Sequence, residues 1–124
     1  MSVSYFYVLM RHLRSPGLLL VLLLLSPVTV ARASDERAID AITERLGRIC
    51  KNRVATAFSA ASKADITVNV GATLQDSIDS GEVSLADIRR SGLSFDWKVR
   101  RQGTDPHGYC NIEADGTIES FSQW

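Results

Sequence analysis

The sequence predicts a small α+β domain in which a long N-terminal amphipathic helix packs on an antiparallel sheet. Three observations support this fold class. Apolar residues recur at helical spacing from Ile39, apolar and polar residues alternate from Leu93 onward, and each of these two parts contains one cysteine, Cys50 and Cys110. We expect the sheet to be a three-stranded C-terminal meander, with 64–70 as a candidate additional strand, and one disulfide to join helix and sheet.

Residues 1–33 have the features of a cleaved signal peptide. Basic Arg11 and Arg14 precede an uninterrupted apolar run, Leu18–Leu25, and Ala31-Arg32-Ala33 forms a small-x-small cleavage site. This apolar run is much shorter than the roughly 20 residues that a membrane-spanning helix needs. We therefore expect cleavage after Ala33 and no membrane span in the mature chain.

The mature chain 34–124 has 124 − 33 = 91 residues, which is enough for one small domain. Translation from Met1 or from Met10 would yield the same mature chain, and the sequence leaves both starts open. All 14 acidic residues remain after cleavage but three of the 14 basic ones leave, so the net charge becomes 11 − 14 = −3. A mildly acidic domain is not expected to bind nucleic acid or an anionic lipid surface. We expect it in the periplasm or secreted.

Two cysteines in an exported chain predict one disulfide, Cys50–Cys110. Closing a loop of 110 − 50 = 60 residues restricts the unfolded chain and contributes roughly 4 kcal/mol of stability. That contribution is comparable to the whole stability of a small domain. The bond is therefore expected to hold the fold together.

The mature chain is predicted to begin with a helix that ends near Ser62-Lys63. Ser34 or Asp35 is expected to cap its start, and acidic residues in the first turn suit the positive end of the helix dipole. Its apolar stripe consists of Ile39, Ile42, Leu46, Ile49, Cys50, Val54, Phe58 and Ala61. Because Cys50 lies on this stripe, its thiol is expected to face the sheet.

The middle of the chain predicts a short strand followed by two short helices. Ala64–Val70 alternates apolar and polar residues, as a half-buried strand does. Thr73–Ser80 has helical spacing, and Ser84 with Asp87 forms a capping box for a second short helix that ends at Ser91-Gly92.

Three strands are predicted after these helices, over Leu93–Arg100, Tyr109–Glu113 and Thr117–Ser122. The run Leu93–Arg100 alternates without a break. Ala114-Asp115-Gly116 is expected to join the last two strands as a three-residue turn, with glycine at the position that needs positive φ.

The three-residue turn predicts the register of the last hairpin. It pairs Ile112 with Ile118 and Cys110 with Ser120, whereas a two-residue turn would set Ile112 against Glu119. In the predicted register Phe121 falls on the face opposite Ile118. Either a β-bulge or a second small aromatic cluster with Tyr109 would accommodate it, and the sequence leaves both open.

Exposed aromatic residues supply the first functional hypothesis. Tyr109, Phe121 and Trp124 are candidates for the second face of the sheet, where they would form a partner-binding face for another envelope or extracellular protein. The alternative is that residues 64–91 fold over this face. The sequence does not decide between these two arrangements.

The segment Asp76–Asp87 resembles an EF-hand calcium loop in part. Its candidate oxygen ligands are Asp76, Ser80, Glu82, Ser84 and Asp87, and Gly81 stands at the sixth position. Ile78, however, occupies the third ligand position, and Asp87 is shorter than the usual bidentate Glu. The segment therefore predicts at most a weak calcium module, and a glycine turn before a Ser84-capped helix explains the same residues.

The mature chain has a single histidine, His107, which lies beside Asp105 and Pro106. A small hydrolase centred on His107 is a further alternative, but no nucleophile signature accompanies this residue and the cysteines are expected to be bridged. The sequence shows no phosphate-binding glycine loop and no metal-ligand cluster, so no cofactor is expected. We interpret the chain as a small exported, disulfide-stapled binding or accessory protein without catalysis.

Overall fold

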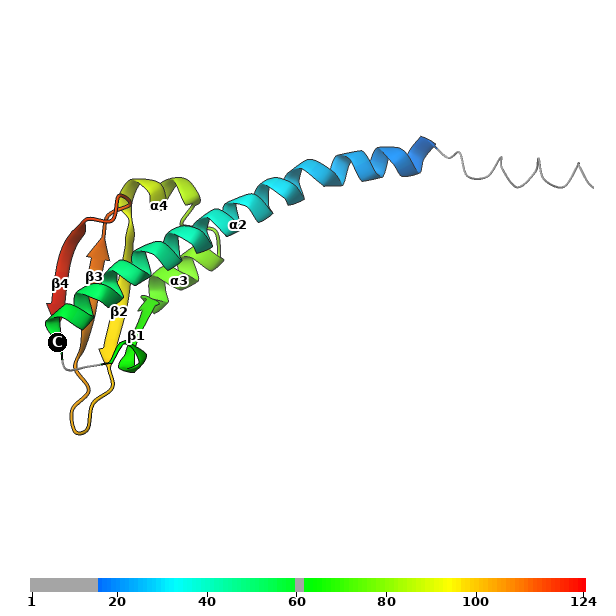
Figure 1. Cartoon of the computed structure of the whole chain (residues 1–124). Coiled ribbons are helices and arrows are strands. Elements are labelled where there is room, and N and C mark those ends of the chain that lie inside the picture. The colour runs from blue at the N-terminus through cyan, green and yellow to red at the C-terminus, as the bar shows by residue number, and fades with distance from the viewer. Residues whose placement is uncertain (1–15, 60–61) are drawn as a thin grey trace, which may run out of the picture. The chain divides into compact units, whose positions relative to one another are not determined.

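The chain folds as one long helix followed by a four-stranded antiparallel sheet and two short helices (Figure 1). The computed structural model describes the backbone of residues 16–59 and 62–124, and the side chains from Thr29 onward within them. In chain order the elements are α2 (Pro16–Ala57), the 3₁₀ turn η1 (Lys63–Asp65), β1 (Ile66–Val70), α3 (Ala72–Asp79), α4 (Leu85–Ser91), β2 (Leu93–Val99), β3 (His107–Ile112) and β4 (Ile118–Gln123).

The predicted α+β fold class is confirmed, with one strand more than the three-stranded meander. The strand order is β1-β2-β3-β4, and β1 pairs antiparallel with β2, Val68 opposite Trp97. The strand predicted over 64–70 therefore forms, although it begins at Ile66. Residues 63–65 make the 3₁₀ turn instead, because the Ser62 hydroxyl accepts a hydrogen bond from the Ala64 N–H and starts that turn.

One face of the sheet and the stripe of α2 form the core. Figure 1 shows α2 crossing this face, with α3 and α4 beside it. Within the described part of the chain, the buried hydrophobic residues are three from α2, four from β2, two from β3 and one each from β1 and α4: Leu46, Cys50, Val54, Ile66, Ile88, Leu93, Phe95, Trp97, Val99, Cys110 and Ile112. Partly buried Leu74 and Ile78 of α3 pack against the same cluster. α2, α3 and α4 thus all contribute apolar surface to this one core.

The ends of α2 differ from the prediction. The helix runs through Ser34 and Asp35, so neither residue caps it in the full chain. No proline or glycine occurs between Val28 and Leu46, and nothing in the sequence stops a helix there. At its other end α2 stops at Ala57, before the predicted end near Ser62-Lys63, and Phe58 packs against Trp97 at 5.4 Å between ring centroids.

Several residues of the sequence predictions lie outside the described part of the chain. These are Met1, Met10, Arg11 and Arg14 near the start and Ala61 after α2.

The last hairpin confirms the predicted turn but not the whole predicted register. Gly116 has a φ of 96°, and Ile112 pairs with Ile118 as expected. Cys110, however, pairs with Phe121 and not with Ser120, because a bulge at Glu119 shifts the register. This shift turns Phe121 to the core side of the sheet, where its ring stacks on Trp97 at 5.3 Å with an interplanar angle of 5°.

Two arginines extend this aromatic packing into a continuous stack. The Arg53 guanidinium of α2 lies over the Phe121 ring at 4.3 Å, and that of Arg101 lies over Phe58 at 5.4 Å. Trp97 stands between Phe121 and Phe58. The stack ties the end of α2 to β2, to β4 and to the loop after β2.

The predicted disulfide between Cys50 of α2 and Cys110 of β3 is present, with the two Cα atoms 5.9 Å apart. Both cysteines are fully buried at the centre of the core. The bond therefore links the helix and the sheet at the place where their apolar surfaces meet.

Replacing both cysteines by alanine is expected to lower the free energy of unfolding by about 4 kcal/mol, because the bond closes a 60-residue separation in the unfolded chain. Urea unfolding followed by circular dichroism measures this change. Reduced wild-type protein is the matched control, since it keeps both side chains and lacks only the bond. Equal urea midpoints for oxidised and reduced wild type would contradict the expectation.

Candidate functional site

The face of the sheet turned away from α2 is uncovered among the residues that the structure describes. We call this surface the open face. Its members follow from strand alternation and pairing: Thr67, Asn69, Ser94, Asp96, Lys98, His107, Tyr109, Asn111, Ser120, Ser122 and Trp124. Thr67, Asn69, Asp96, Lys98 and His107 are all exposed. α3 and α4 pack on the core side of the sheet. Of the two arrangements that the sequence left undecided, the structure therefore has the one in which the second sheet face is uncovered.

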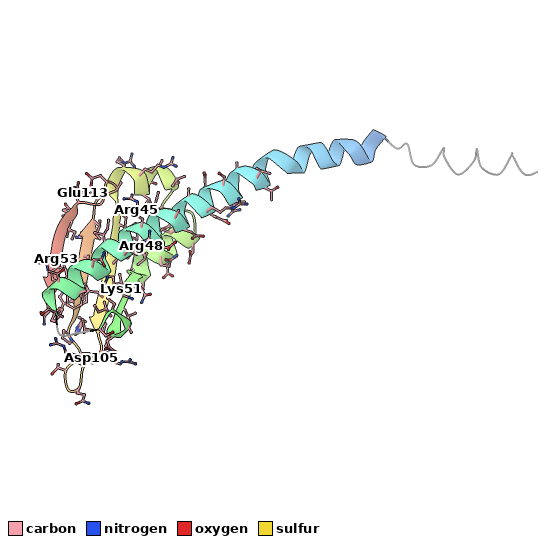
Figure 2. The ribbon with its side chains drawn as sticks, in the orientation of Figure 1. Arg45, Arg48, Lys51, Arg53, Asp105 and Glu113 are labelled. Atoms are coloured by element: carbon pink, nitrogen blue, oxygen red, sulfur yellow. A yellow bond between two sulfur atoms is a disulfide. The ribbon has the colours of Figure 1, made fainter. Side chains whose placement is uncertain are left out.

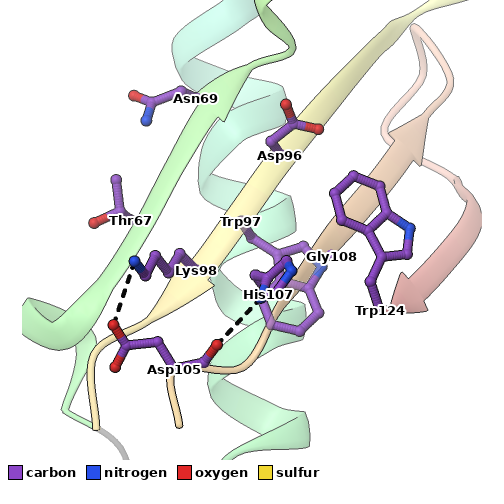
Figure 3. A pocket seen from close by; sticks show the side chains of 9 residues that line it. All are labelled: Thr67, Asn69, Asp96, Trp97, Lys98, Asp105, His107, Gly108 and Trp124. Atoms are coloured by element: carbon purple, nitrogen blue, oxygen red, sulfur yellow. Dashed lines mark hydrogen bonds and ion pairs between the residues drawn. The ribbon is translucent and has the colours of Figure 1, made fainter.

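The open face carries an open hollow of about 540 Å³ (Figure 3). Its lining residues come from β1, β2 and β3, from the loop before β3 and from the residue after β4: Thr67, Asn69, Asp96, Trp97, Lys98, Asp105, His107, Gly108 and Trp124. The volume lies in the range of about 300–1,000 Å³ that is typical of small-molecule sites.

Gly108 permits the close packing beneath this hollow. A Cβ atom at this position would lie 1.9 Å from the Ser122 carbonyl oxygen and 2.8 Å from Cζ2 of Trp97. Only glycine therefore lets β4 and the Trp97 ring approach β3 so closely.

Three aromatic rings gather at one corner of the open face. Trp124 is 67% exposed, and its ring centroid lies 5.8 Å from that of His107 and 5.8 Å from that of Tyr109. The backbone N–H of Trp124 donates a hydrogen bond of 2.9 Å to the His107 carbonyl oxygen. Backbone pairing thus holds a large, exposed indole in place beside the hollow.

Asp105 organises the opposite rim of the hollow. Its carboxylate accepts a 2.9 Å hydrogen bond from the Arg101 N–H and lies 3.3 Å from the Lys98 ammonium. The Arg101 N–H, and then Lys98, hold the pKa of the Asp105 carboxyl below its ordinary value of 3.8. The opposite charges of Lys98 and Asp105 therefore sum to zero.

His107 is oriented by a main-chain group. Its Nδ1 lies 3.2 Å from the Asp105 carbonyl oxygen, which can only accept, so Nδ1–H donates this hydrogen bond (Figure 3). Nε2 is then the free position of the ring. The Asp105 carboxylate contacts Lys98 and the backbone of Arg101 rather than the imidazole.

The structure places two of the three predicted partner-binding aromatics on the open face. Tyr109 and Trp124 lie there, but Phe121 does not. The bulge at Glu119 turns Phe121 to the core side, between Trp97 and the Arg53 guanidinium. The prediction for Phe121 was therefore wrong, because burying its ring against Trp97 overrides simple alternation along β4.

The candidate calcium segment folds as the end of α3, a turn and the start of α4. Asp76 lies within α3, and Asp87 caps α4 in the predicted capping box with Ser84. Hydrogen bonds from the Ser84 hydroxyl and backbone lower the pKa of Asp87, which also pairs with Arg90. Ser80 and Glu82 bond to groups of Ser77. In residues 29–59 and 62–124, no group of three or more acidic, histidine or cysteine side chains could hold a metal.

Basic side chains line α2, and the partners of three of those labelled in Figure 2 can be named. Figure 2 labels Arg45, Arg48, Lys51 and Arg53 along this helix. Arg45 donates to the Ala114 carbonyl oxygen at 2.6 Å, Arg48 pairs with Glu44, and Arg53 covers the Phe121 ring. The Arg45 and Arg53 contacts hold α2 against the sheet and the last turn, and Arg48 pairs within the helix, so α2 offers a weaker candidate site than the open face.

The sequence predicts Asp96 and Lys98 as outward residues beside the aromatic face, but it does not single out Thr67 or Asn69. Thr67, Asn69, Asp96 and Lys98 are the outward residues of two alternating runs, so their exposure could be predicted. That the residues of the two strands lie side by side could not be predicted, because this depends on the pairing of β1 with β2, which sets Asn69 opposite Asp96.

Comparison with known proteins finds no match to a family model, to a characterised protein or to a solved structure. Within residues 29–59 and 62–124, no helix combines the length and the apolar character needed to span a membrane.

Acid is expected to loosen the loop between β2 and β3 by protonating Asp105. Because the folded pKa is depressed, the stabilisation is fully present above the ordinary value of 3.8 and is lost as the pH falls through the lower folded pKa. An NMR titration of the side-chain carboxyl carbons measures the midpoint directly. Asp105→Asn should remove this titration and weaken protection of the Arg101 amide at neutral pH. A midpoint at or above 3.8 would contradict the expectation.

Proposed function

We propose that the chain is an exported, non-catalytic binding protein, held together by its disulfide, that uses the open face to contact its partner outside the cytoplasm. The observation that carries the proposal is the uncovered sheet face with the exposed Trp124 ring at its corner. A sheet has two faces, and this domain has helices on only one of them among the described residues.

The case for export comes from residues 1–33. A basic start, an apolar run and an Ala-Arg-Ala site occur there in the order that signal peptidase substrates require. The compact unit Asp35–Trp124 begins one residue after Ser34, the expected mature N-terminus. A disulfide is consistent with export, since such bonds persist in oxidising compartments.

The case for binding comes from the aromatic corner. Tryptophan and tyrosine are enriched where proteins contact their partners, because each buries a large area at little cost in side-chain entropy. Trp124 is held by the backbone bond to His107 and nevertheless keeps most of its surface in water. A partner that covers this ring would gain that buried area without reordering the strand.

Expression of the full chain in a bacterial host tests the export part of the proposal. We expect the product to begin at Ser34, to occur in the periplasm or medium, and to resist thiol alkylation without reductant. Intact mass and N-terminal sequencing measure these outcomes. Ala33→Asp is the matched variant, because a charged residue at the cleavage position should block processing. A full-length cytoplasmic product with two reactive thiols would overturn the export part.

Substitution of the aromatic corner tests the binding part. Trp124→Ala is expected to abolish retention of a partner from envelope and secreted fractions, and to change the free energy of unfolding by only about 0.5 kcal/mol, as exposed positions do. Cross-linked affinity capture and urea unfolding measure the two quantities. Arg89→Ala, at an exposed position of α4, is the matched control. Equal retention by wild type and by Trp124→Ala would contradict the role of the open face.

A further inference from the structure

We propose that the ligand of the open face is a neutral oligosaccharide, with Trp124 stacking on a sugar ring and the polar side chains of the hollow bonding its hydroxyls. This inference rests on the proposed function, because it requires a free open face outside the cytoplasm. It adds the chemical class of the ligand.

The side-chain composition of the open face favours a sugar over a protein as its ligand. Every side chain on it is polar or aromatic, and none is aliphatic. The centre of a protein–protein interface is apolar and depleted in charged residues, which this surface is not. A sugar ring presents an apolar C–H face and a rim of hydroxyls. It therefore needs one aromatic platform surrounded by hydrogen-bonding groups.

Two side chains of the hollow have hydrogen-bonding groups that could bind sugar hydroxyls. The side chains of Asn69 and Asp96 lie directly opposite each other on β1 and β2 and both line the hollow. Within the described residues, neither side chain makes a hydrogen bond or an ion pair, so both are available to a ligand. Asn69 offers a donor and an acceptor, and Asp96 offers two acceptors, which suits a pair of neighbouring hydroxyls.

The charge balance favours a neutral ligand. Lys98 and Asp105 neutralise each other across 3.3 Å, which leaves Asp96 as the one unpaired charge among the residues that line the hollow. A phosphate or sulfate group would meet this carboxylate without a free cation beside it. A strongly cationic ligand would find only one acidic partner.

The width of the sheet favours more than one sugar unit. Trp124 follows the edge strand β4 and Asn69 lies on the other edge strand, β1. The Trp124 ring lies beside His107 and Tyr109 of β3, so about two strand spacings, or roughly 10 Å, separate it from Asn69. This span exceeds a single sugar ring, so a chain of two or three units would contact both the indole and the Asn69–Asp96 pair.

Screening of the mature chain on an array of neutral and charged oligosaccharides, followed by titration of the hits, tests the inference. Tryptophan fluorescence is a site-specific readout, because Trp124 is 67% exposed whereas Trp97 is 2% exposed in the core. We expect at least one neutral oligosaccharide to produce a saturable change. Trp124→Ala and Asp96→Asn should each weaken its binding at least tenfold by calorimetry, and Arg89→Ala on α4 should leave it unchanged.

The isosteric Asp96→Asn variant keeps the test valid if Trp124→Ala disturbs β4, and circular dichroism checks the fold of both. Binding of charged glycans alone, or binding that both variants retain, would overturn the inference. If no glycan binds but a protein partner is captured through Trp124, the carbohydrate assignment fails and the proposed function stands. If neither a glycan nor a protein depends on Trp124, both fail.

Discussion

The packing of one helix on one sheet face is the constraint on which the rest of the structure depends. Leu46, Cys50 and Val54 of α2 meet the inward residues of β2 and β3, and the Cys50–Cys110 bond lies at the middle of this contact. A domain of this size has too little chain to cover a second sheet face. The short helices add to the same core. One-sided burial therefore explains both the stability of the fold and the polar, accessible character of the open face.

The parts of the fold that follow from local periodicity could be predicted from the sequence. Alternation over Leu93–Val99 indicates a half-buried strand, and the position of Cys50 on a helical stripe indicates its partner side. The bulge at Glu119 could not be chosen in advance, because it depends on the space beside Trp97 that Phe121 fills. The start of α2 differs from the prediction because the helix was expected to begin at the mature N-terminus, whereas residues 28–46 contain no helix breaker and α2 runs through them in the full chain.

The candidate site divides in the same way. Tyr109 and Trp124 were identified from the sequence because exposed aromatics near a strand end are conspicuous in a short chain. Asn69 was not identified, since it is an ordinary polar residue whose place opposite Asp96 depends on strand pairing between distant segments. The hydrolase alternative centred on His107 stays a prediction, and the structure shows only that its Nδ1 lies against the Asp105 carbonyl oxygen. The make-up of this surface depends on strand register more than on any local motif.

The bulge in β4 has a consequence for how copies of the chain meet. β4 is an edge strand, and a regular edge presents a row of unpaired N–H and C=O groups to any other strand that approaches. The extra residue, Glu119, breaks this row and adds a carboxylate at the break. The bulge that buries Phe121 thereby also disfavours pairing between the edge strands of neighbouring molecules. Such pairing would otherwise lead toward fibres at high local concentration.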